Sequence, residues 1–254
     1  MQIAVVGDVH GHLAGMYRIL ARYNQAHDEP IELVLQAGDF GAFPDAERLD
    51  GATRKHVKND PTELGFSAYL AGRRTAPIRT IFIAGNHEDF DFLQSHQDQE
   101  LDASGKLYCL GNGSVVRPVA NVLVGGLWGI STSGPRRYKG DPRKYVDDEA
   151  CLRLMEHDGG RVDILLCHDV PWDSTHGAVH RGSRRLAEVV ECIQPRYVFH
   201  GHTSGDDPPW WLGRTQVIGL NQSCFVKIPH RDGGIVLVDT DTWQWQALDS
   251  GRAG

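Results

Sequence analysis

The sequence predicts an α/β fold, because apolar strands alternate with amphipathic helices along most of the chain. Residues 3–6 form an apolar run typical of a buried strand, and apolar side chains recur at helical spacing over residues 12–26. A second apolar strand at residues 31–36 completes a strand–helix–strand pattern, which favours two parallel, neighbouring strands. From residue 210 onward short strands follow one another without a helix, which predicts a second sheet that is antiparallel at its end.

Further strands and helices follow in the same alternating order. Residues 43–60 are polar and predicted to be irregular. Residues 107–110 and 115–116 flank a Gly-Asn-Gly turn, a pattern typical of short paired strands. The other predicted elements are, in chain order, helix 63–70, strands 77–83 and 122–127, helix 147–157, strand 162–166, helix 183–193 and strands 197–199, 215–218, 224–228, 235–238 and 243–246.

Length and composition indicate the number of domains, and the net charge indicates which ligands the chain can attract. A chain of 254 residues with 41% hydrophobic residues can bury a large core, and no Pro/Ser-rich linker divides it, so we expect a single domain over residues 1–254. The formal net charge of -7 disfavours nonspecific attraction to a long polyanion. A nucleic acid substrate would therefore require a local basic patch.

The cysteines and the beginning of the chain indicate a cytoplasmic protein. The five cysteines are odd in number, scattered and never in a Cys-x-x-Cys pair, which argues against a disulfide framework and a zinc finger. A strand begins within the first three residues, no basic leader precedes it, and no apolar run approaches the ~20 residues of a membrane span. We expect a soluble protein with no membrane partner, and the sequence indicates no protein partner.

Polar side chains that can bind metal follow five predicted strands, each at the point where the strand ends. In an open α/β sheet, residues at the carboxyl ends of the strands converge even when they are far apart in sequence. A single such aspartate is as well explained as a helix cap, and a single such histidine as a hydrogen-bonded structural group. Five coincident strand ends favour one common ligand site instead. The residues are Asp8, His10, Asp39, Asn86, His87, His168, His200 and His202.

These strand ends carry the motifs GDVHG, GDF, GNHE, CHD and GHT, in this order. Over about residues 1–205 the chain resembles the calcineurin-like metallophosphoesterase superfamily in these motifs. The resemblance implies a two-sheet β-sandwich flanked by helices, with a dinuclear metal centre at the C-terminal ends of the strands. It also implies a metal-dependent enzyme that hydrolyses phosphate esters with a hydroxide that bridges the two metals.

The resemblance also assigns roles to individual residues. It implies that Asp39 bridges the metals and that His87 protonates the leaving oxygen, although His87 could instead orient the metal ligands. Mixed carboxylate, amide and imidazole ligands suit two divalent transition metals (Mn, Fe, Ni or Zn) better than Mg or Ca. The implied ligands are Asp8, His10, Asp39 and His202 for one ion, and Asp39, Asn86, His168 and His200 for the other.

Two local features narrow the resemblance. The protein phosphatase branch carries Gly-Asp-x-x-Asp-Arg-Gly, but Asp39 is followed here by Phe-Gly-Ala. The last motif of many relatives is Gly-His-x-His, whereas His202 is followed here by Thr203-Ser204-Gly205. Residues 125–130 and 166–171 resemble segments of RNA lariat-debranching enzymes, which have a cysteine at the position of Asp8 and a lariat-recognition insertion. This likeness indicates that the chain belongs to a group of the superfamily that neighbours the debranching enzymes, and it does not predict debranching activity.

A loop at residues 131–145 carries five basic residues, which could bind phosphates beyond the scissile one. The alternative is a solvated charge run that keeps the protein soluble. Together with tryptophans that could stack on bases, the loop favours a phosphodiester in a nucleotide or short nucleic acid over a monoester. A phosphomonoesterase, a protein phosphatase-like activity and a noncatalytic binding module stay as alternatives. The basic residues are Arg136, Arg137, Lys139, Arg143 and Lys144, and the tryptophans are Trp128, Trp172, Trp210 and Trp211.

Overall fold

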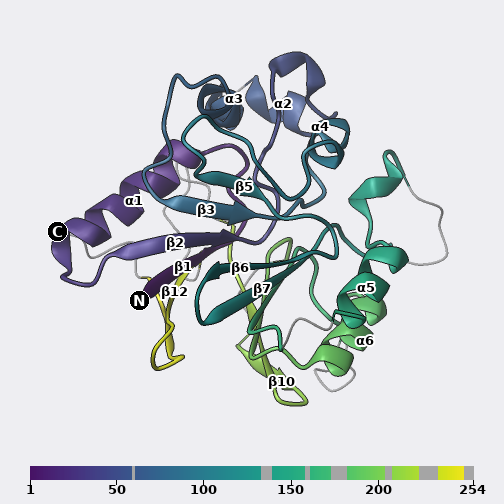
Figure 1. Cartoon of the computed structure of the whole chain (residues 1–254). Coiled ribbons are helices and arrows are strands. Elements are labelled where there is room, and N and C mark those ends of the chain that lie inside the picture. Colours follow the sequence, from purple (N-terminus) through teal and green to yellow (C-terminus); the bar gives the residue numbers. More distant parts are fainter. Residues whose placement is uncertain are drawn as a thin grey trace.

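Two mixed β-sheets lie between two layers of helices (Figure 1). In the described part of the chain one sheet has seven strands and the other has six. This confirms the predicted α/β sandwich flanked by helices, whereas the single domain over residues 1–254 stays a prediction. The computed structural model describes residues 1–58, 61–132, 139–157, 161–172, 182–203, 208–222 and 234–248.

The first sheet contains most of the strands from the first half of the chain. Its strands are parallel from β1 through β2 and β3 to β5, and antiparallel at both edges. In spatial order the strands are β13 (Trp245–Ala247), β12 (Ile235–Asp239), β1 (Gln2–Val6), β2 (Ile31–Gln36), β3 (Arg79–Phe82), β5 (Leu107–Cys109) and β4 (Gln99–Glu100).

The second sheet has a parallel centre with an antiparallel pair at each edge. In spatial order its strands are β10 (Trp210–Leu212), β11 (Thr215–Gly219), β9 (Tyr197–His200), β8 (Ile164–Cys167), β7 (Val122–Leu127) and β6 (Val115–Val119). The C-terminal ends of β7, β8 and β9 therefore meet at one edge of this sheet, as those of β1, β2 and β3 do in the first sheet.

Helices cover the outer face of each sheet. The buried face of α1 packs into the core that fills the space between and beside the sheets, whereas α5 and α6 form a second apolar cluster with the outer face of the second sheet (Figure 1). The helices are α1 (Leu13–Ala26), α2 (Thr53–Val57), α3 (Gly65–Leu70), α4 (Phe90–Gln94), α5 (Asp148–Met155) and α6 (Arg184–Ile193), with short 3-10 helices η1 (Ala46–Arg48), η2 (Pro61–Leu64) and η3 (Pro142–Lys144).

An aromatic group anchors the first sheet close to the strand ends. The rings of Phe40 and Phe82 stack with centroids 4.1 Å apart, and Phe66 from α3 packs edge-on against Phe40. All three side chains are fully buried. Because a fully buried side chain of this kind contributes about 1.5–3 kcal/mol, this group stabilises the turn that follows β2.

The predicted irregular segment at residues 43–60 contains regular structure, so this prediction was wrong in part. It forms η1 and α2. The side chain of Asp50 begins α2 by accepting hydrogen bonds from Ala52 N and Thr53 N at 2.8 and 2.7 Å. A five-residue helix with one buried side chain, Thr53, is too short to show helical periodicity in the sequence.

The strands around the Gly-Asn-Gly turn do not pair with one another, which corrects a second expectation. β5 belongs to the first sheet and β6 to the second, so the turn crosses between the sheets. It is held to β7 by hydrogen bonds from Gly113 N to Gly126 O (2.8 Å) and from Trp128 N to Asn112 Oδ1 (2.9 Å). Local turn residues predicted the reversal, but the long-range bonds to β7 determined the pairing partner.

The C-terminal strands divide between the two sheets. β10 and β11 form an antiparallel pair at the end of the second sheet, as predicted, but β12 and β13 return to the edge of the first sheet beside β1. The predicted strand at residues 224–228 lies outside the described residues. Within the described part of the chain no helix has the length and apolarity needed to cross a bilayer, and the four cysteines described there are free thiols.

Replacing Phe82 with Ala should lower the free energy of unfolding by about 3–5 kcal/mol, because it leaves a cavity in the aromatic group. Urea denaturation measures this change. Trp211→Ala is the control, since Trp211 is 65% exposed and should shift stability by no more than about 0.5 kcal/mol. Equal losses in the two variants would show that the aromatic group does not anchor the fold.

Candidate metal centre

The ends of β1 and β2 bring Asp8, His10 and Asp39 together. Asp39 O accepts hydrogen bonds from Val9 N (3.2 Å) and His10 N (2.8 Å), so the two turns are joined through their backbones. His10, Asp39 and His202 all have positive φ angles, of 42°, 51° and 60°. Left-handed backbone is uncommon for residues other than glycine and clusters at functional sites. Here it turns three predicted ligands away from their strands.

The two carboxylate oxygens of Asp39 have different surroundings. One accepts backbone hydrogen bonds that hold the side chain in place, and the other faces imidazoles. Its Oδ1 accepts hydrogen bonds from Asn86 N and His87 N, both at 2.7 Å. Its Oδ2 lies 3.8 Å from His10 Nε2 and 3.5 Å from His168 Nε2. Burial opposes ionisation, but the nearby imidazoles outweigh it and hold the pKa of Asp39 below its usual range. A carboxylate oriented in this way could bridge two cations.

His168 connects the two sheets at this point. Its Nδ1 lies 2.9 Å from Ala37 O, and because a carbonyl only accepts hydrogen bonds, this contact places a proton on Nδ1. The remaining nitrogen, Nε2, lies 3.1 Å from Asn86 Oδ1 and 3.5 Å from Asp39 Oδ2. Burial opposes protonation of His168, but the charges of Asp39 and Asp8 outweigh it and raise its pKa to about 10. A proton therefore satisfies both oxygens when no metal ion is bound, and a metal ion could take the place of that proton. This donor set therefore fits a metal ion.

Asp8 completes a buried cluster with Asp39 and His168, whose ligand atoms all lie within 4.8 Å of one another. Asp8 and Asp39 are only 7% and 2% exposed. Burial and the charge of Asp39 raise the pKa of Asp8, although the imidazoles of His168 and His10 oppose this. Two carboxylates so close in an apolar interior need compensating positive charge. Divalent cations would supply it.

Glycines allow this close packing at two of the motifs. A Cβ atom at Gly85 would lie 2.2 Å from Asp39 Oδ1, and one at Gly201 would lie 2.1 Å from Asp8 Oδ1. Each glycine therefore lets the backbone of one strand end approach the carboxylate of another. This explains physically why glycine precedes Asn86 and lies between His200 and His202.

The remaining predicted ligands lie around this cluster. His202 N donates to Asp8 Oδ1 at 3.2 Å, and the His202 and His168 rings are 5.3 Å apart. His200 is buried at the end of β9, with Nδ1 3.1 Å from Gly201 O. The fold thus brings Asp8, Asp39, His168 and His202 together at the strand ends of both sheets, and the role of His200 as a ligand stays a prediction.

His87 is oriented by a carboxylate that the sequence did not indicate. Its Nδ1 lies 2.8 Å from Asp50 Oδ2, and its ring is 5.9 Å from that of His10. This hydrogen bond raises the pKa of His87, although partial burial opposes the shift. Asp50 lies in the segment predicted to be irregular, and no local pattern distinguishes it from its polar neighbours.

Glu88 is a second residue that the sequence analysis did not assign, although it belongs to the GNHE motif. It is 4% exposed, and its two oxygens accept hydrogen bonds from Phe40 N (2.7 Å) and Ala42 N (2.6 Å). Burial, together with the charge of Asp39, raises the pKa of Glu88 to about 8. Glu88 therefore fixes the turn after Asp39 from the neighbouring strand.

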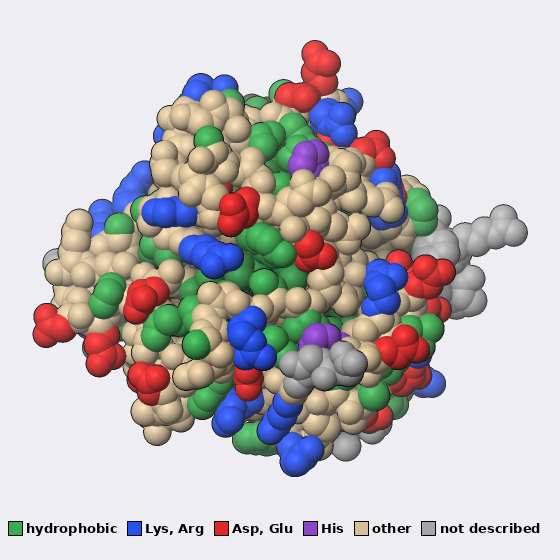
Figure 2. All heavy atoms as spheres, viewed as in Figure 1, with side chains coloured by type: hydrophobic (Ala, Val, Ile, Leu, Met, Phe, Trp, Pro, Cys, Tyr) green, Lys and Arg blue, Asp and Glu red, His purple; other side chains and the backbone are tan. Residues whose placement is uncertain are grey.

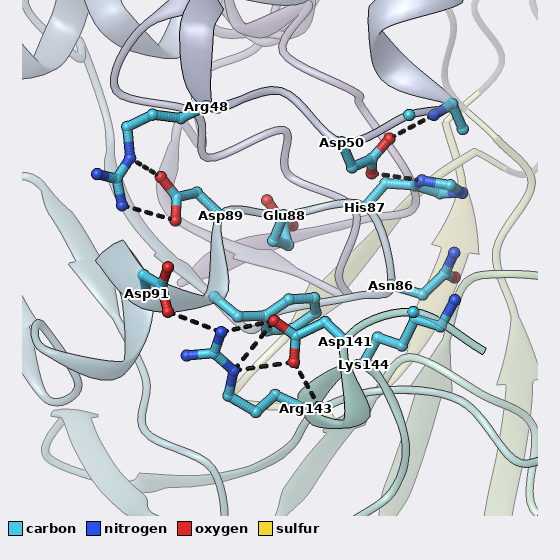
Figure 3. Close-up of a pocket in the computed structure, with 14 residues that line it drawn as sticks. Arg48, Asp50, Asn86, His87, Glu88, Asp89, Asp91, Asp141, Arg143 and Lys144 are labelled. Carbon is cyan, nitrogen blue, oxygen red and sulfur yellow. Dashed lines mark hydrogen bonds and ion pairs between the residues drawn. The ribbon is translucent and has the colours of Figure 1, made fainter. Parts of the chain in front are cut away.

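Two adjoining pockets open over these residues. The first, of about 340 Å³, is lined by Asp8, His10, Asp39 and His202 among others. The second, of about 440 Å³, shares His87 and Ala52 with the first and is also lined by Asn86, another predicted metal ligand (Figure 3). The imidazole of His87 thus lines both pockets.

The basic loop is described only from residue 139 onward. The predicted substrate-binding residues Arg136 and Arg137 lie outside the described residues. Lys139 is exposed, and its backbone exchanges hydrogen bonds with the Tyr145 hydroxyl, so its role in substrate binding stays a prediction. Arg143 and Lys144 line the second pocket, as expected for a loop on the same rim as the ligands.

The model of the calcineurin-like phosphoesterase family matches residues 1–205, which include every strand end described above. The chain belongs to this family. Members of this family are metal-dependent phosphoric ester hydrolases. Calcineurin-like phosphoesterases use a dinuclear divalent metal centre, and the cluster of Asp8, Asp39 and His168 is the candidate site for it here.

Similarity to individual proteins supports membership of the family. The chain is 30% identical over 237 residues to a lariat debranching enzyme of Arabidopsis thaliana, covering 80% of this chain and 54% of that protein. The corresponding human enzyme is 29% identical over 236 residues, with 80% and 42% covered. The chain thus spans about half the length of these relatives.

Solved structures share the fold at low sequence identity. A protein of Thermus thermophilus superposes with a TM-score of 0.59 at 12% identity, covering 98% of both chains. A dimetal phosphatase from Danio rerio superposes with a TM-score of 0.58 at 13% identity, covering 93% of this calcineurin-like phosphoesterase and 91% of that protein. At these identities the likeness concerns the fold alone.

We predict that the native protein binds about two transition-metal ions per chain and that Asp39→Ala loses both, because Asp39 is the proposed shared ligand. Elemental analysis by mass spectrometry after gel filtration measures the metal content. Asp148→Asn, which changes an exposed carboxylate on α5, should retain both ions. An Asp39→Ala protein with two tightly bound ions would rule out the bridging role.

Proposed function

We propose that this chain hydrolyses phosphodiesters in nucleotides or short nucleic acids. The observation that carries this proposal is the pair of adjoining pockets that His87 lines. A phosphodiester has an organic group on each side of its phosphorus, whereas a monoester has only one. Two adjoining pockets offer space for both groups, the leaving group beside His87 and the retained group that only a diester has. The similarity to lariat debranching enzymes, over about half of their length, supports the same preference.

The proposed ligands divide between two divalent transition-metal ions such as Mn, Fe, Ni or Zn. When bound, such ions would neutralise the phosphate charge and lower the pKa of water at the site. Asp39 is proposed as the shared ligand, because its Oδ2 faces imidazoles from two different strand ends. The proposed sets are Asp8, His10, Asp39 and His202 for one ion and Asp39, Asn86, His168 and His200 for the other.

His87 is proposed to protonate the leaving oxygen. The hydrogen bond between Nδ1 and Asp50 holds the imidazole in one orientation, so that Nε2 is the nitrogen available for transfer. As the phosphorus–oxygen bond breaks, the electron pair stays on the leaving oxygen and the Nε2 proton moves to it. The carboxylate of Asp50 stabilises the imidazolium before this transfer.

The surface favours a short substrate over a long one. On the face shown in Figure 2, Lys and Arg side chains gather only in a small area at the lower middle and are interspersed with Asp and Glu elsewhere. A long polyanion gains most of its affinity from an extended basic surface. Trp128 does not support base stacking as expected, because it is only 4% exposed and its Nε1 donates to Leu110 O in the core.

Kinetics with two aryl substrates test the proposal. With added Mn²⁺, kcat/KM for bis(p-nitrophenyl) phosphate should exceed that for p-nitrophenyl phosphate. A panel of nucleotides and short RNA and DNA would then identify the natural class. A higher kcat/KM for the monoester would instead support a phosphomonoesterase or protein phosphatase-like activity.

We predict that His87→Ala retains its metals while kcat falls by roughly 10²–10⁴, the usual scale of general acid catalysis. The defect should be smaller for nitrophenyl esters than for alkyl esters, because a leaving group of low pKa needs little protonation. His27→Ala, a change at an exposed histidine beyond α1, is the control. Equal losses on both classes of ester would indicate that His87 orients the metals or the phosphate.

A further inference from the structure

Part of the lining of the first pocket has no role in the proposed reaction. Four of the nine residues that line this pocket are proposed metal ligands, and a fifth is His87, the proposed acid. Three of the other four belong to α2 or directly precede it. The four are Ala52, Thr53 and His56 at α2 and Gln222, which follows β11.

The start of α2 is fixed relative to His87. Asp50 Oδ1 accepts hydrogen bonds from Ala52 N and Thr53 N at 2.8 and 2.7 Å. The other oxygen of the same carboxylate, Oδ2, lies 2.8 Å from His87 Nδ1, as Figure 3 shows. One side chain therefore holds both the helix and the imidazole of the proposed acid.

His56 lies on the face of α2 that lines the first pocket. His56 N donates to Ala52 O at 3.3 Å, which is the spacing of a helical turn. Residues three and four apart share one face of a helix, so His56 lies on the same face as Ala52 and Thr53. Thr53 is only 7% exposed, whereas the side chain of His56 is exposed. His56 is therefore accessible to a ligand in this pocket.

The helix is also tied to the segment before it. Arg54 Nη2 donates to Glu47 O at 3.2 Å and to Leu49 O at 3.0 Å. These hydrogen bonds act together with those of Asp50 at the start of the helix. The backbone that carries His56 is therefore held at several points, although the helix has only five residues.

The lining passes from one pocket to the other along α2. The segment 50–52 lines the second pocket, whereas Ala52, Thr53 and His56 line the first. Because a helix rises about 1.5 Å per residue, His56 lies about 6 Å along the axis from Ala52, which lines both pockets. His56 therefore lies about one helical turn farther along the wall than the point at which Asp50 holds His87.

The retained ester group of a phosphodiester needs its own place in the site. Four proposed ligands line the first pocket, against one in the second, so the phosphate and the start of the retained group lie in the first. In the proposed reaction the leaving group lies beside His87, which protonates its oxygen. The exposed polar side chains of His56 and Gln222 complete the lining of the first pocket. The retained group therefore extends toward them.

From these observations we propose that His56 binds the retained nucleoside of the substrate. An imidazole can stack on a base, and its ring nitrogens can donate or accept a hydrogen bond with a sugar hydroxyl. This inference rests on the proposed phosphodiesterase function and defines its substrate more narrowly, as a diester whose retained group is a nucleoside. His56 is a specificity-determining residue in this scheme and takes no part in bond breaking.

The test compares substrates that share one leaving group. Thymidine 5′-(p-nitrophenyl phosphate) and its 3′ isomer retain a nucleoside when p-nitrophenol leaves, whereas methyl p-nitrophenyl phosphate retains only a methyl group. With added Mn²⁺, His56→Ala should raise KM for at least one thymidine ester roughly 3–10-fold, the scale of one hydrogen bond. The kcat should hardly change, because the contact is made equally before and during bond breaking. The KM for the methyl ester should stay the same.

Product binding gives a readout that does not depend on turnover. Isothermal titration calorimetry should show that His56→Ala weakens the binding of the matching thymidine phosphate and leaves the binding of methyl phosphate unchanged. Lys55→Ala is the matched control, because Lys55 precedes His56 on α2 but is not among the residues that line the first pocket. This variant should retain the native KM for all three esters.

The inference and the proposed function fail in different ways. An unchanged KM for both thymidine esters in His56→Ala, or an equal rise for the methyl ester, would overturn the inference while hydrolysis of bis(p-nitrophenyl) phosphate still upheld the proposed function. Absence of that hydrolysis in the native protein would overturn both.

Discussion

The structure depends on holding two buried carboxylates, Asp8 and Asp39, close to one another. Their ligand atoms and that of His168 lie within 4.8 Å, in an interior where unpaired charge is strongly unfavourable. Every local feature of the strand ends serves this arrangement. Parallel register brings the ends together, left-handed backbone turns the side chains inward, and Gly85 and Gly201 leave room for the carboxylate oxygens. The need for compensating charge is what makes the cluster a candidate metal site.

A second set of contacts holds the chemistry in position from outside this cluster. Glu88 fixes the turn after β2 through Phe40 N and Ala42 N, and Asp50 orients His87. Both carboxylates act through hydrogen bonds to groups on other elements. The segment between β2 and α3 therefore contributes to the proposed catalytic machinery, although it contains only short helices.

Charge pairing beyond His87 shapes the second pocket. Arg48 bonds to Asp89, and Asp91 and Asp141 share Arg143. Which carboxylates lie beside each arginine depends on α4 and on the loop before η3, and the basic residues of the loop do not by themselves record this pairing.

The sequence by itself determined the order of the longer strands and helices and the polar residues at the strand ends, because apolar periodicity and the glycine-flanked motifs are local patterns, whereas short elements such as α2 and α4 escaped it. The tertiary structure alone decided which strands pair, as when β5 and β6 separate into different sheets and β12 returns to β1. It also decided that Asp50 bonds His87 and that Trp128 is buried. The physical reason is that pairing, burial and charge neutralisation arise between residues far apart in the chain, and no short stretch of sequence records which partner a residue will meet.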